Sequence, residues 1–341
     1  MFAPSLGLRI IGGNFMRILI IGKKQIMHWP ENVQKFLSNH ETEIFFYNTH
    51  TPVTLFYKMI SQRRRFAYVA QKLKRKIETF KPDLLLYISS FFIPQECYDI
   101  LKDFPDIPRV GWVSDAFSSE QKPKADFLDV LFCSDTGYLK ATKNFKSRNL
   151  FLPLCADETV FKNSHLPRTG APFFAGVGND KRNAYLAAIQ DRCVIYGRRW
   201  PKEMLSQHEV HNYKLQHDRL QDFINRTIAP INMTFSPNII DGLNFRIFEI
   251  AACGGLIIVN ESKDLKTCYT IGKEAVTYRT PQDLNKLIHD IVTHPDKYQK
   301  IAEAGFQRTM REHTYQKRME QMFDILRTLG IIGNAKKKLI K

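Results

Sequence analysis

The sequence has no apolar run long enough to cross a membrane as a helix. The longest candidate, residues 84–94, is interrupted by Ser89 and Ser90, whereas a membrane-spanning helix needs about 20 apolar residues. The first 15 residues contain a single arginine and lack the charged, apolar and small-residue order of a secretory signal. We therefore expect neither a transmembrane helix nor an export signal. A strand-like run begins at Met16, so we interpret residues 1–15 as an extension in front of the folded chain.

Closely spaced metal or redox ligands are also lacking. The six cysteines form no C-x-x-C pair, a pattern that favours a reducing cytoplasm over zinc or redox chemistry. His208, His211 and His217 lie near one another, but the H-E-V-H run differs from the H-E-x-x-H spacing of zinc enzymes. We expect no bound metal and no other cofactor.

Acidic residues are few beside basic ones, 34 against 50, which gives a net charge of +16 and implies an anionic partner or surface. In residues 62–81, apolar residues recur at helical spacing and cations fill the remaining positions. This predicts a helix with one buried face and one cationic ridge. The ridge is interpreted either as a docking face for an anionic membrane or lipid-linked acceptor, or as a solvated face. The basic cluster 335–341 is a second such patch or a solvated end. Nucleic acid is not expected, because no binding motif accompanies the charge.

Short apolar runs alternate with helix-length amphipathic segments along the whole chain. The runs that predict strands are residues 17–21, 43–47, 84–88, 109–113, 130–133, 172–177, 193–196, 230–235, 256–259 and 275–278. This alternation predicts an α/β fold of parallel sheets covered by helices. Ten strands are too many for one sheet and the pattern breaks at 157–171, so we predict two Rossmann-like domains, 16–165 and 166–312, facing across a cleft. Residues 313–341 are interpreted as a helix that crosses back, followed by the basic tail.

The segment 231–260 is the most informative for chemistry. A strand leads into a polar loop, Asn244 is placed to cap a helix over 245–253, and two glycines end that helix. The start of such a helix suits an anion such as a diphosphate. Glu249 lies in the helix and Asp241 eight positions before it. The two carboxylates could contact two ends of one ligand; alternatively, Glu249 is solvated and Asp241 forms a turn.

The run L-N-F-R-I-F-E-I-A-A-C-G-G-L at 243–256 resembles the donor-site signature of the spore-maturation (CgeB-like) branch of the group 1 glycosyltransferases, which have the two-domain GT-B fold. Further segments are similar to the same family in the same order: V-G-W-V-S-D at 110–115, L-P-L-C-A-D-E-T-V-F at 152–161, G-V-G-N-D-K-R-N at 176–183, V-I-Y-G-R-R-W at 194–200 and H-T-Y-Q-K-R-M at 313–319. The resemblance covers about residues 16–330.

This resemblance implies roles for the residues of the second domain. Glu249 would bind the ribose of the donor nucleotide, with Asn244 and Arg246 helping to hold the donor. Asp241 stands at the first position of the E-x7-E pattern of retaining GT-B enzymes, where Glu is usual. GT-B enzymes generally need no metal, and the absence of a D-x-D triplet agrees with that.

Cations near the strand ends are candidates for the donor phosphates. The glycine turn at Gly178 is followed by Lys181 and Arg182, which could neutralise a leaving diphosphate; the alternative is a solvated first turn of a helix. Arg198 lies at the end of the next predicted strand. It is interpreted either as a contact to the nucleotide-sugar at the same rim or as an ordinary surface cation.

In the first domain, Asp115 follows a predicted strand and is interpreted as an acceptor-binding residue or general base, with a helix cap as the alternative. His28 could be a base in an inverting variant but suits a structural role beside Trp29.

Taken together, the resemblance and the charge predict a cytoplasmic, membrane-peripheral glycosyltransferase of the hexosyltransferase type. It would be retaining and metal-independent, and would move a sugar from a nucleotide-sugar to a glycan, lipid-linked or protein acceptor, with a cell-envelope glycan fitting the basic surface. A GT-B scaffold or nucleotide-binding protein without activity, and a GT-B epimerase or phosphorylase, are the alternatives.

Overall fold

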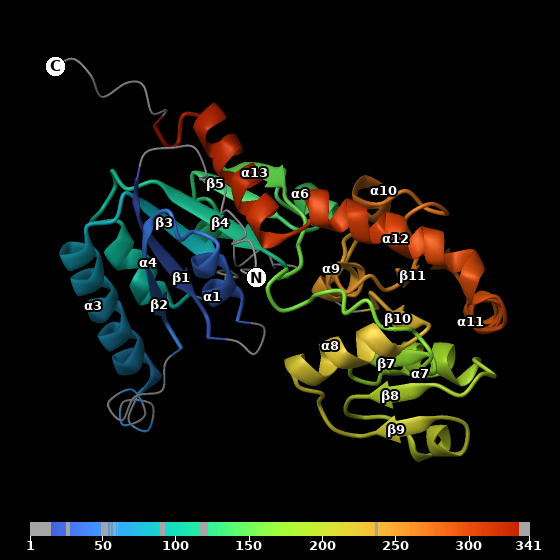
Figure 1. Ribbon diagram of the computed structural model, residues 1–341. Coiled ribbons are helices and arrows are strands. Elements are labelled where there is room, and N and C mark those ends of the chain that lie inside the picture. Colours follow the sequence, from blue (N-terminus) through green and yellow to red (C-terminus); the bar gives the residue numbers. More distant parts are fainter. Residues whose placement is uncertain are drawn as a thin grey trace, which may run out of the picture.

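The computed structural model describes residues 15–24, 28–48, 54, 56, 59, 61–88, 93–115, 122–235 and 238–333 (Figure 1). The chain forms two α/β domains, each built on a parallel six-stranded sheet. The suggested extension before Met16 and the basic cluster 335–341 lie almost wholly outside the described part.

The first sheet has the strand order β2-β1-β3-β4-β5-β6, with every pair parallel. Its strands are β1 (Arg17–Gly22), β2 (Glu41–Phe46), β3 (Leu84–Ile88), β4 (Arg109–Val113), β5 (Val130–Cys133) and β6 (Arg148–Phe151). The helices between them are α1 (Trp29–Lys35), α3 (Gln62–Phe80), α4 (Gln95–Leu101), α5 (Lys122–Ala125) and α6 (Thr136–Ala141). Side chains on both faces of the central strands are buried, because helices cover the two faces.

The second sheet has the order β12-β11-β10-β7-β8-β9 and is also entirely parallel. Its strands are β7 (Phe173–Ala175), β8 (Val194–Tyr196), β9 (Glu209–His211), β10 (Pro230–Asn232), β11 (Ile258–Asn260) and β12 (Val276–Tyr278). Its helices are α7 (Asp180–Ala187), the 3₁₀ helix Lys202–Ser206, α8 (His217–Arg226), α9 (Phe245–Ala252), α10 (Leu265–Cys268), α11 (Pro281–Thr293) and α12 (Pro295–Glu312). In both sheets the order reverses direction at one point, where ligands of doubly wound folds bind.

The predicted α/β class with two doubly wound parallel sheets is confirmed, and each predicted strand overlaps an observed one. The sequence pattern missed β6 and β9, which form one edge of each sheet. β6 reads R-N-L-F and β9 reads E-V-H, so neither has the apolar run of a strand that is buried on both faces.

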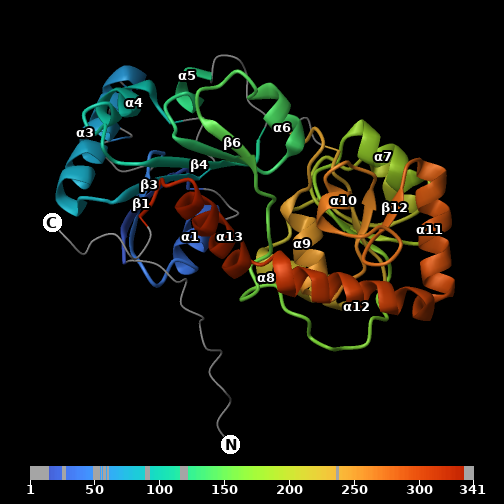
Figure 2. The same ribbon diagram turned by 90° about the horizontal axis from the view of Figure 1, so that it is seen from above.

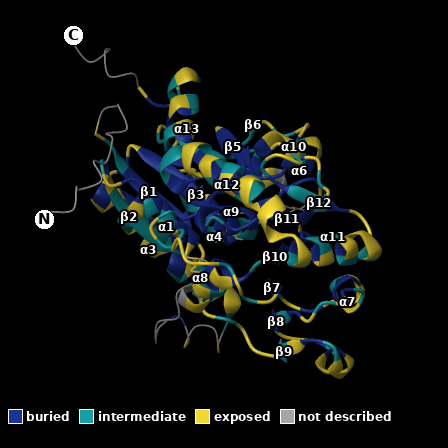
Figure 3. Cartoon of the chain, turned by 45° about the vertical axis from the view of Figure 1, so that its right-hand side comes forward, coloured by how far each residue is buried: buried dark blue, intermediate teal, exposed yellow. Residues whose placement is uncertain are grey.

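The helix predicted over the basic segment 62–81 is confirmed as α3. Its buried residues include Val69, Leu73 and Ile77, and Arg63 and Arg64 are exposed. Figure 3 shows the same division elsewhere, with dark buried strands inside and exposed residues on the outer helix faces. No helix within the described ranges is long and apolar enough to cross a membrane.

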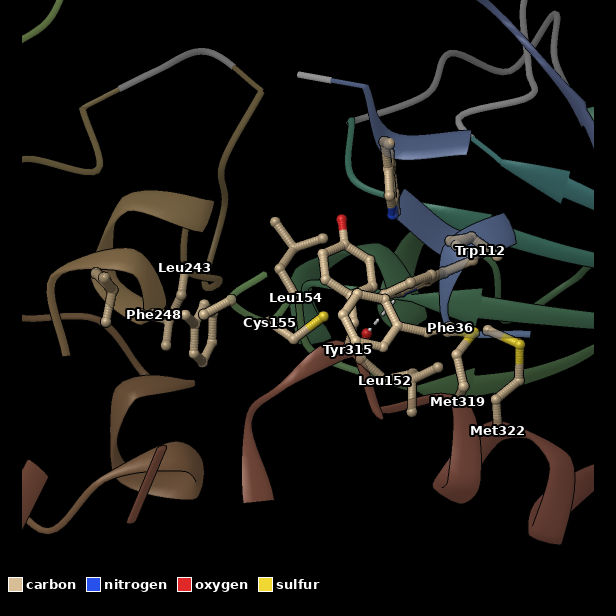
Figure 4. Packing of buried hydrophobic residues seen from close by; sticks show 14 of the residues in the cluster. Phe36, Trp112, Leu152, Leu154, Cys155, Leu243, Phe248, Tyr315, Met319 and Met322 are labelled. Carbon is tan, nitrogen blue, oxygen red and sulfur yellow. Dashed lines mark hydrogen bonds between the residues drawn. The ribbon is translucent and has the colours of Figure 1, made fainter. Parts of the chain in front are cut away.

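The last helix, α13 (Tyr315–Thr328), leaves the second domain and packs on the first (Figures 1 and 2). Thr314 caps it and pairs with Ala156 in an isolated bridge. The ring of Tyr315 stacks on Phe36 with centroids 5.5 Å apart, and Trp112 meets the same ring edge-on (Figure 4). One apolar core therefore runs from the first sheet through α13 to α9 of the second domain.

Candidate functional site

Helix α9 begins where the polar loop after β10 ends, and its last residue, Ala252, is followed by the C-cap Cys253 and by Gly254, whose φ of +69° suits a helix end. Asn244 occupies the N-cap position, but its side chain makes no capping hydrogen bond. The predicted side-chain cap is therefore wrong. The Nδ2 atom of Asn244 donates instead to Oδ1 of Asn232 at 3.2 Å, which ties the start of α9 to the end of β10. Among the described residues, no side chain accepts a hydrogen bond from the free amides of the helix start.

Glu249 is only 3% exposed, so the alternative of a solvated helix residue is excluded. It lines a cavity of about 130 Å³ between the domains, together with His28 of the first domain and Tyr315 of α13. Its Oε2 atom lies 3.4 Å from Nη1 of Arg246, one helical turn away. Burial raises the pKa of Glu249, and the charge of Arg246 opposes that shift.

Asp241 is also buried, at 8% exposed, but it lines a different and larger cleft of about 710 Å³ beside β7, β10 and β11. Its carboxylate pairs with Nζ of Lys140 at 3.1 Å and with Nζ of Lys263 at 3.0 Å. Burial alone would raise the pKa of Asp241, but the hydrogen bonds from the two lysines outweigh it and lower the pKa. The structure thus places the two carboxylates of the D-x7-E pattern in separate cavities.

The glycine turn after β7 brings two loops together. A Cβ on Gly178 would lie 2.4 Å from the carbonyl oxygen of Arg199, so only glycine permits this approach. The N–H of Gly178 donates to the carbonyl of Arg198 at 2.8 Å. The ends of β7 and β8 are therefore joined at the rim where Arg198 stands.

Lys181 and Arg182 lie in the first turn of α7, which Asn179 caps. Lys181 is exposed, and its Nζ lies 4.1 Å from the ring centre of Phe235 at the larger cleft, which also contains Asp241. The guanidinium of Arg182 donates to the carbonyl of Val177 at 2.8 Å. Burial lowers the pKa of Arg182. Arg182 therefore braces the glycine turn, whereas Lys181 faces the cleft.

A cluster of three cations lies at the ends of β8, β9 and the start of α9. Desolvation and the charges of Arg198 and Arg246 lower the pKa of Lys214, so the positive charges of both arginines act on this exposed lysine. Lys214 was not among the residues predicted from the sequence. A single lysine in a polar loop gives no signal until the fold brings it beside other cations.

Asp115 lies just after β4 and is half-buried. Its Oδ1 atom accepts a hydrogen bond from Nδ2 of Asn238 at 3.1 Å, so it faces the second domain. Burial raises the pKa of Asp115.

His28 is exposed at the start of α1, with a left-handed φ of 48°. It lines the cavity that holds Glu249.

Two of the three other histidines singled out from the sequence have partners of their own. His208 is buried, and its Nδ1 accepts the backbone N–H of Cys193 at 3.3 Å. His211 stacks on Tyr196 with ring centroids 4.3 Å apart. The side chain of His217 lies outside the described part of the chain. Within the described residues no group of three His, Cys, Asp or Glu could hold a metal ion.

Residues 181–324, less than half of the chain, match a family model described as glycosyl transferase-like. No curated protein sequence matches the chain. Solved structures match nearly all of it. A glycosyltransferase of Rickettsia africae aligns at 9% identity with a TM-score of 0.68, over 93% of this chain and 99% of that one. Sucrose-phosphate synthase of Thermosynechococcus elongatus aligns at 13% identity with a TM-score of 0.65, over 92% and 99%.

A third similar structure is HepE of Anabaena in complex with UDP and glucose. It aligns at 11% identity with a TM-score of 0.65, over 92% of this chain and all of that one. The fold is GT-B. At these identities the likeness of the structures concerns the fold, while the family match concerns the second domain, which contains α9 and Glu249.

Proposed function

We propose that this protein is a glycosyltransferase that moves a sugar from a nucleotide-diphosphate sugar to an acceptor held mainly by the first domain. The observation that carries the proposal is the buried carboxylate of Glu249. It stands on the first helix after the polar loop of a glycosyl transferase-like domain, and its Oε2 atom lacks a hydrogen-bond partner within the described chain. An unpartnered buried carboxylate oxygen is costly unless a ligand donates to it, and ribose hydroxyls are such donors.

Positive charge near Glu249 supports a diphosphate in the donor. Arg246 is one turn away, and the charges of Arg246 and Arg198 both act on Lys214. Like charges that act on one another repel until an anion is bound, so a diphosphate would be stabilised there without a metal. The complex of HepE with UDP and glucose shows that a protein of this fold holds such a nucleotide.

The decisive experiment is calorimetric titration with UDP, GDP, ADP and dTDP on the wild type, Glu249→Gln and Glu303→Gln. Glu303 is an exposed glutamate of α12 and serves as the matched control. We expect one nucleotide to bind the wild type and the control equally, and to bind Glu249→Gln at least about tenfold more weakly. Equal binding by all three proteins would contradict the donor site.

Retention of anomeric configuration is the expected stereochemical outcome, because Asp241 and Glu249 stand at the positions of the paired acids of retaining GT-B enzymes. Proton NMR of the first-formed product distinguishes the two anomers. A product with inverted anomeric configuration would contradict a retaining mechanism that uses the paired acids. It would favour Asp115 or His28 as a general base.

We further propose that α3 docks on an anionic membrane surface at the inner face of the cell membrane, where a lipid-linked or cell-envelope glycan acceptor would be reached. The supporting observations are that Arg63 and Arg64 of α3 are exposed and that α3 lies on the outer side of the first domain (Figure 1). Sedimentation with anionic and with neutral vesicles tests this. Arg63→Glu/Arg64→Glu should lose binding to anionic vesicles, whereas Lys266→Glu/Lys273→Glu on the second domain should keep it.

A nucleotide-binding protein without turnover is the second candidate. It is favoured by one observation: the carboxylate of Asp241, which stands where the family has Glu, is already paired with Lys140 and Lys263. Nucleotide binding with neither sugar transfer nor donor hydrolysis would support this candidate.

A further inference from the structure

The two domains meet at the turn between β5 and α6, and a carboxylate of the first domain binds backbone of the second there. Asp135 is 2% exposed. Its Oδ2 atom accepts the N–H of Ile240 at 2.8 Å, and its Oδ1 atom accepts the N–H of Asp241 at 3.0 Å. Oδ1 also accepts the N–H of Gly137 at 2.7 Å, which caps α6. One buried carboxylate thus holds a helix start of its own domain and the loop 238–242 of the other.

Two glycines make this approach possible. A Cβ on Gly242 would lie 2.8 Å from the carboxyl group of Asp135, and a Cβ on Gly137 would lie 2.5 Å from the side chain of Ile240. Real Cβ atoms do not approach other atoms so closely. The two glycines therefore leave the space that the side chains of Asp135 and Ile240 occupy at this contact.

The same turn also reaches the side chain of Asp241. Lys140, on α6, pairs with one oxygen of that carboxylate, and Lys263, from the second domain, pairs with the other. The backbone N–H and the carboxylate of Asp241 are thus both bound by the first domain. The orientation of Asp241 consequently depends on the docking of the two domains.

We propose that Asp135 is a positioning residue for the reaction: it fixes the backbone at Ile240 and Asp241, so that the carboxylate of Asp241 is oriented only when the domains are docked. An open molecule then binds the nucleotide through Glu249 but lacks the oriented Asp241, which limits loss of the donor to water before the acceptor domain closes. The catalytic part of this inference rests on the proposed function, whereas the anchoring of the loop does not.

Asp135→Asn separates the two roles of the carboxylate. Asparagine caps helices as well as aspartate does, so α6 keeps its cap through Oδ1. The amide group takes the place of Oδ2 and turns a donor toward the N–H of Ile240, which is left without an acceptor. The matched control is Thr136→Val. It removes the neighbouring hydroxyl that binds Asp264 across the same interface, but it touches neither Ile240 nor Asp241.

The first measurement is hydrogen exchange at the backbone amides of Ile240 and Asp241. It can be made whether or not the protein is enzymatically active. We expect Asp135→Asn to speed exchange at the amide of Ile240 by at least about tenfold, and Thr136→Val to leave it within about threefold of the wild type. Unchanged exchange in Asp135→Asn, or equal acceleration in Thr136→Val, would overturn the anchoring.

The second readout is the division between kcat and KM. Asp135→Asn should lower kcat by about tenfold or more while the KM for the donor changes by less than about threefold, because Glu249 still binds the nucleotide. An unchanged kcat with accelerated exchange would overturn the catalytic role and leave Asp135 as a structural anchor. If the wild type neither binds a nucleotide nor transfers a sugar, the proposed function is wrong, and so is the catalytic role of Asp135. Hydrogen exchange would still test whether Asp135 anchors the loop.

Discussion

Arg246 and Glu249 lie one turn apart on α9, with Nη1 of the arginine 3.4 Å from Oε2 of the glutamate, and neither of these atoms has a hydrogen-bond partner within the described residues. The two side chains therefore form an ion pair, but Nη1 of Arg246 still has a hydrogen bond to donate and Oε2 of Glu249 can still accept one. Glu249 lines an interdomain cavity of about 130 Å³, which has room for only a few water molecules. Such a pair suits a ligand that has both hydroxyl groups, which can donate to Glu249, and anionic oxygens, which can accept from Arg246.

The first prediction concerns the pH dependence of stability. The pKa of Glu249 is raised by burial, so its folded pKa lies above the unfolded value. Its contribution to stability is therefore present below the unfolded pKa and is lost as the pH rises through the folded pKa. We expect the Tm of Glu249→Gln minus that of the wild type to grow as the pH rises from about 4 to about 8. Thermal unfolding over this range measures it. A constant difference, as expected for exposed Glu303→Gln, would show that Glu249 is not desolvated.

The second prediction separates binding from stability at Lys214. Its pKa is lowered by partial burial and by two neighbouring cations, so its charge opposes folding. Lys214→Met should leave Tm unchanged or raise it, yet it should weaken nucleotide binding on the order of tenfold, with the loss shrinking at high salt. Calorimetry at two salt concentrations checks this. Lys273→Met, at an exposed position remote from the cluster, should change neither quantity. Unaltered affinity in Lys214→Met would remove this residue from the donor site.

Much of the fold follows from the sequence, because parallel strands buried on both faces require unbroken apolar runs, and β3, β4 and β5 have the bounds that their runs predict. The edge strands β6 and β9 lack such runs and are formed by pairing with a neighbour, which no local pattern reveals.

The candidate site, like the fold, contains residues that could be predicted from the sequence and residues that could not. Glu249 could be singled out because the run at 243–256, in which it follows a helix start and precedes a glycine end, resembles a donor-site signature. Lys214 and Lys140 could not, because each is made relevant by partners distant in sequence. Asp135 carried the same signal as Asp115, an acid just after a strand, and could have been found by it. The side chain of Asn244 was mispredicted because a tertiary partner, Asn232, competes with the helix amides for it.

The third prediction tests the glycine turn. Gly178→Ala places a methyl group 2.4 Å from the carbonyl of Arg199, so the β7 and β8 loops must separate. We expect a loss of about 1–3 kcal/mol in the free energy of unfolding and weaker nucleotide binding, since Arg198 moves with its loop. Gly333→Ala is the control, because its Cβ meets nothing within 4 Å. Equal denaturation midpoints for both variants would contradict the close approach of the loops.

The fourth prediction concerns the unity of the two domains. Trp29 is 1% exposed, and its ring meets Trp112 of the first sheet at 5.0 Å and Phe245 of α9 at 5.5 Å between centroids. Trp29→Ala removes a side chain that packs against both domains and should cost about 3–5 kcal/mol. Because α13 and this contact join the cores, the wild type should unfold in one calorimetric transition, whereas Trp29→Ala should show two, as the domains lose their coupling. Trp29→Phe, which keeps an aromatic ring, should restore a single transition. Two transitions in the wild type would show that the shared core does not couple the unfolding of the domains. The orientation of Asp241 would then depend on the contacts of Asp135 and Lys140 alone.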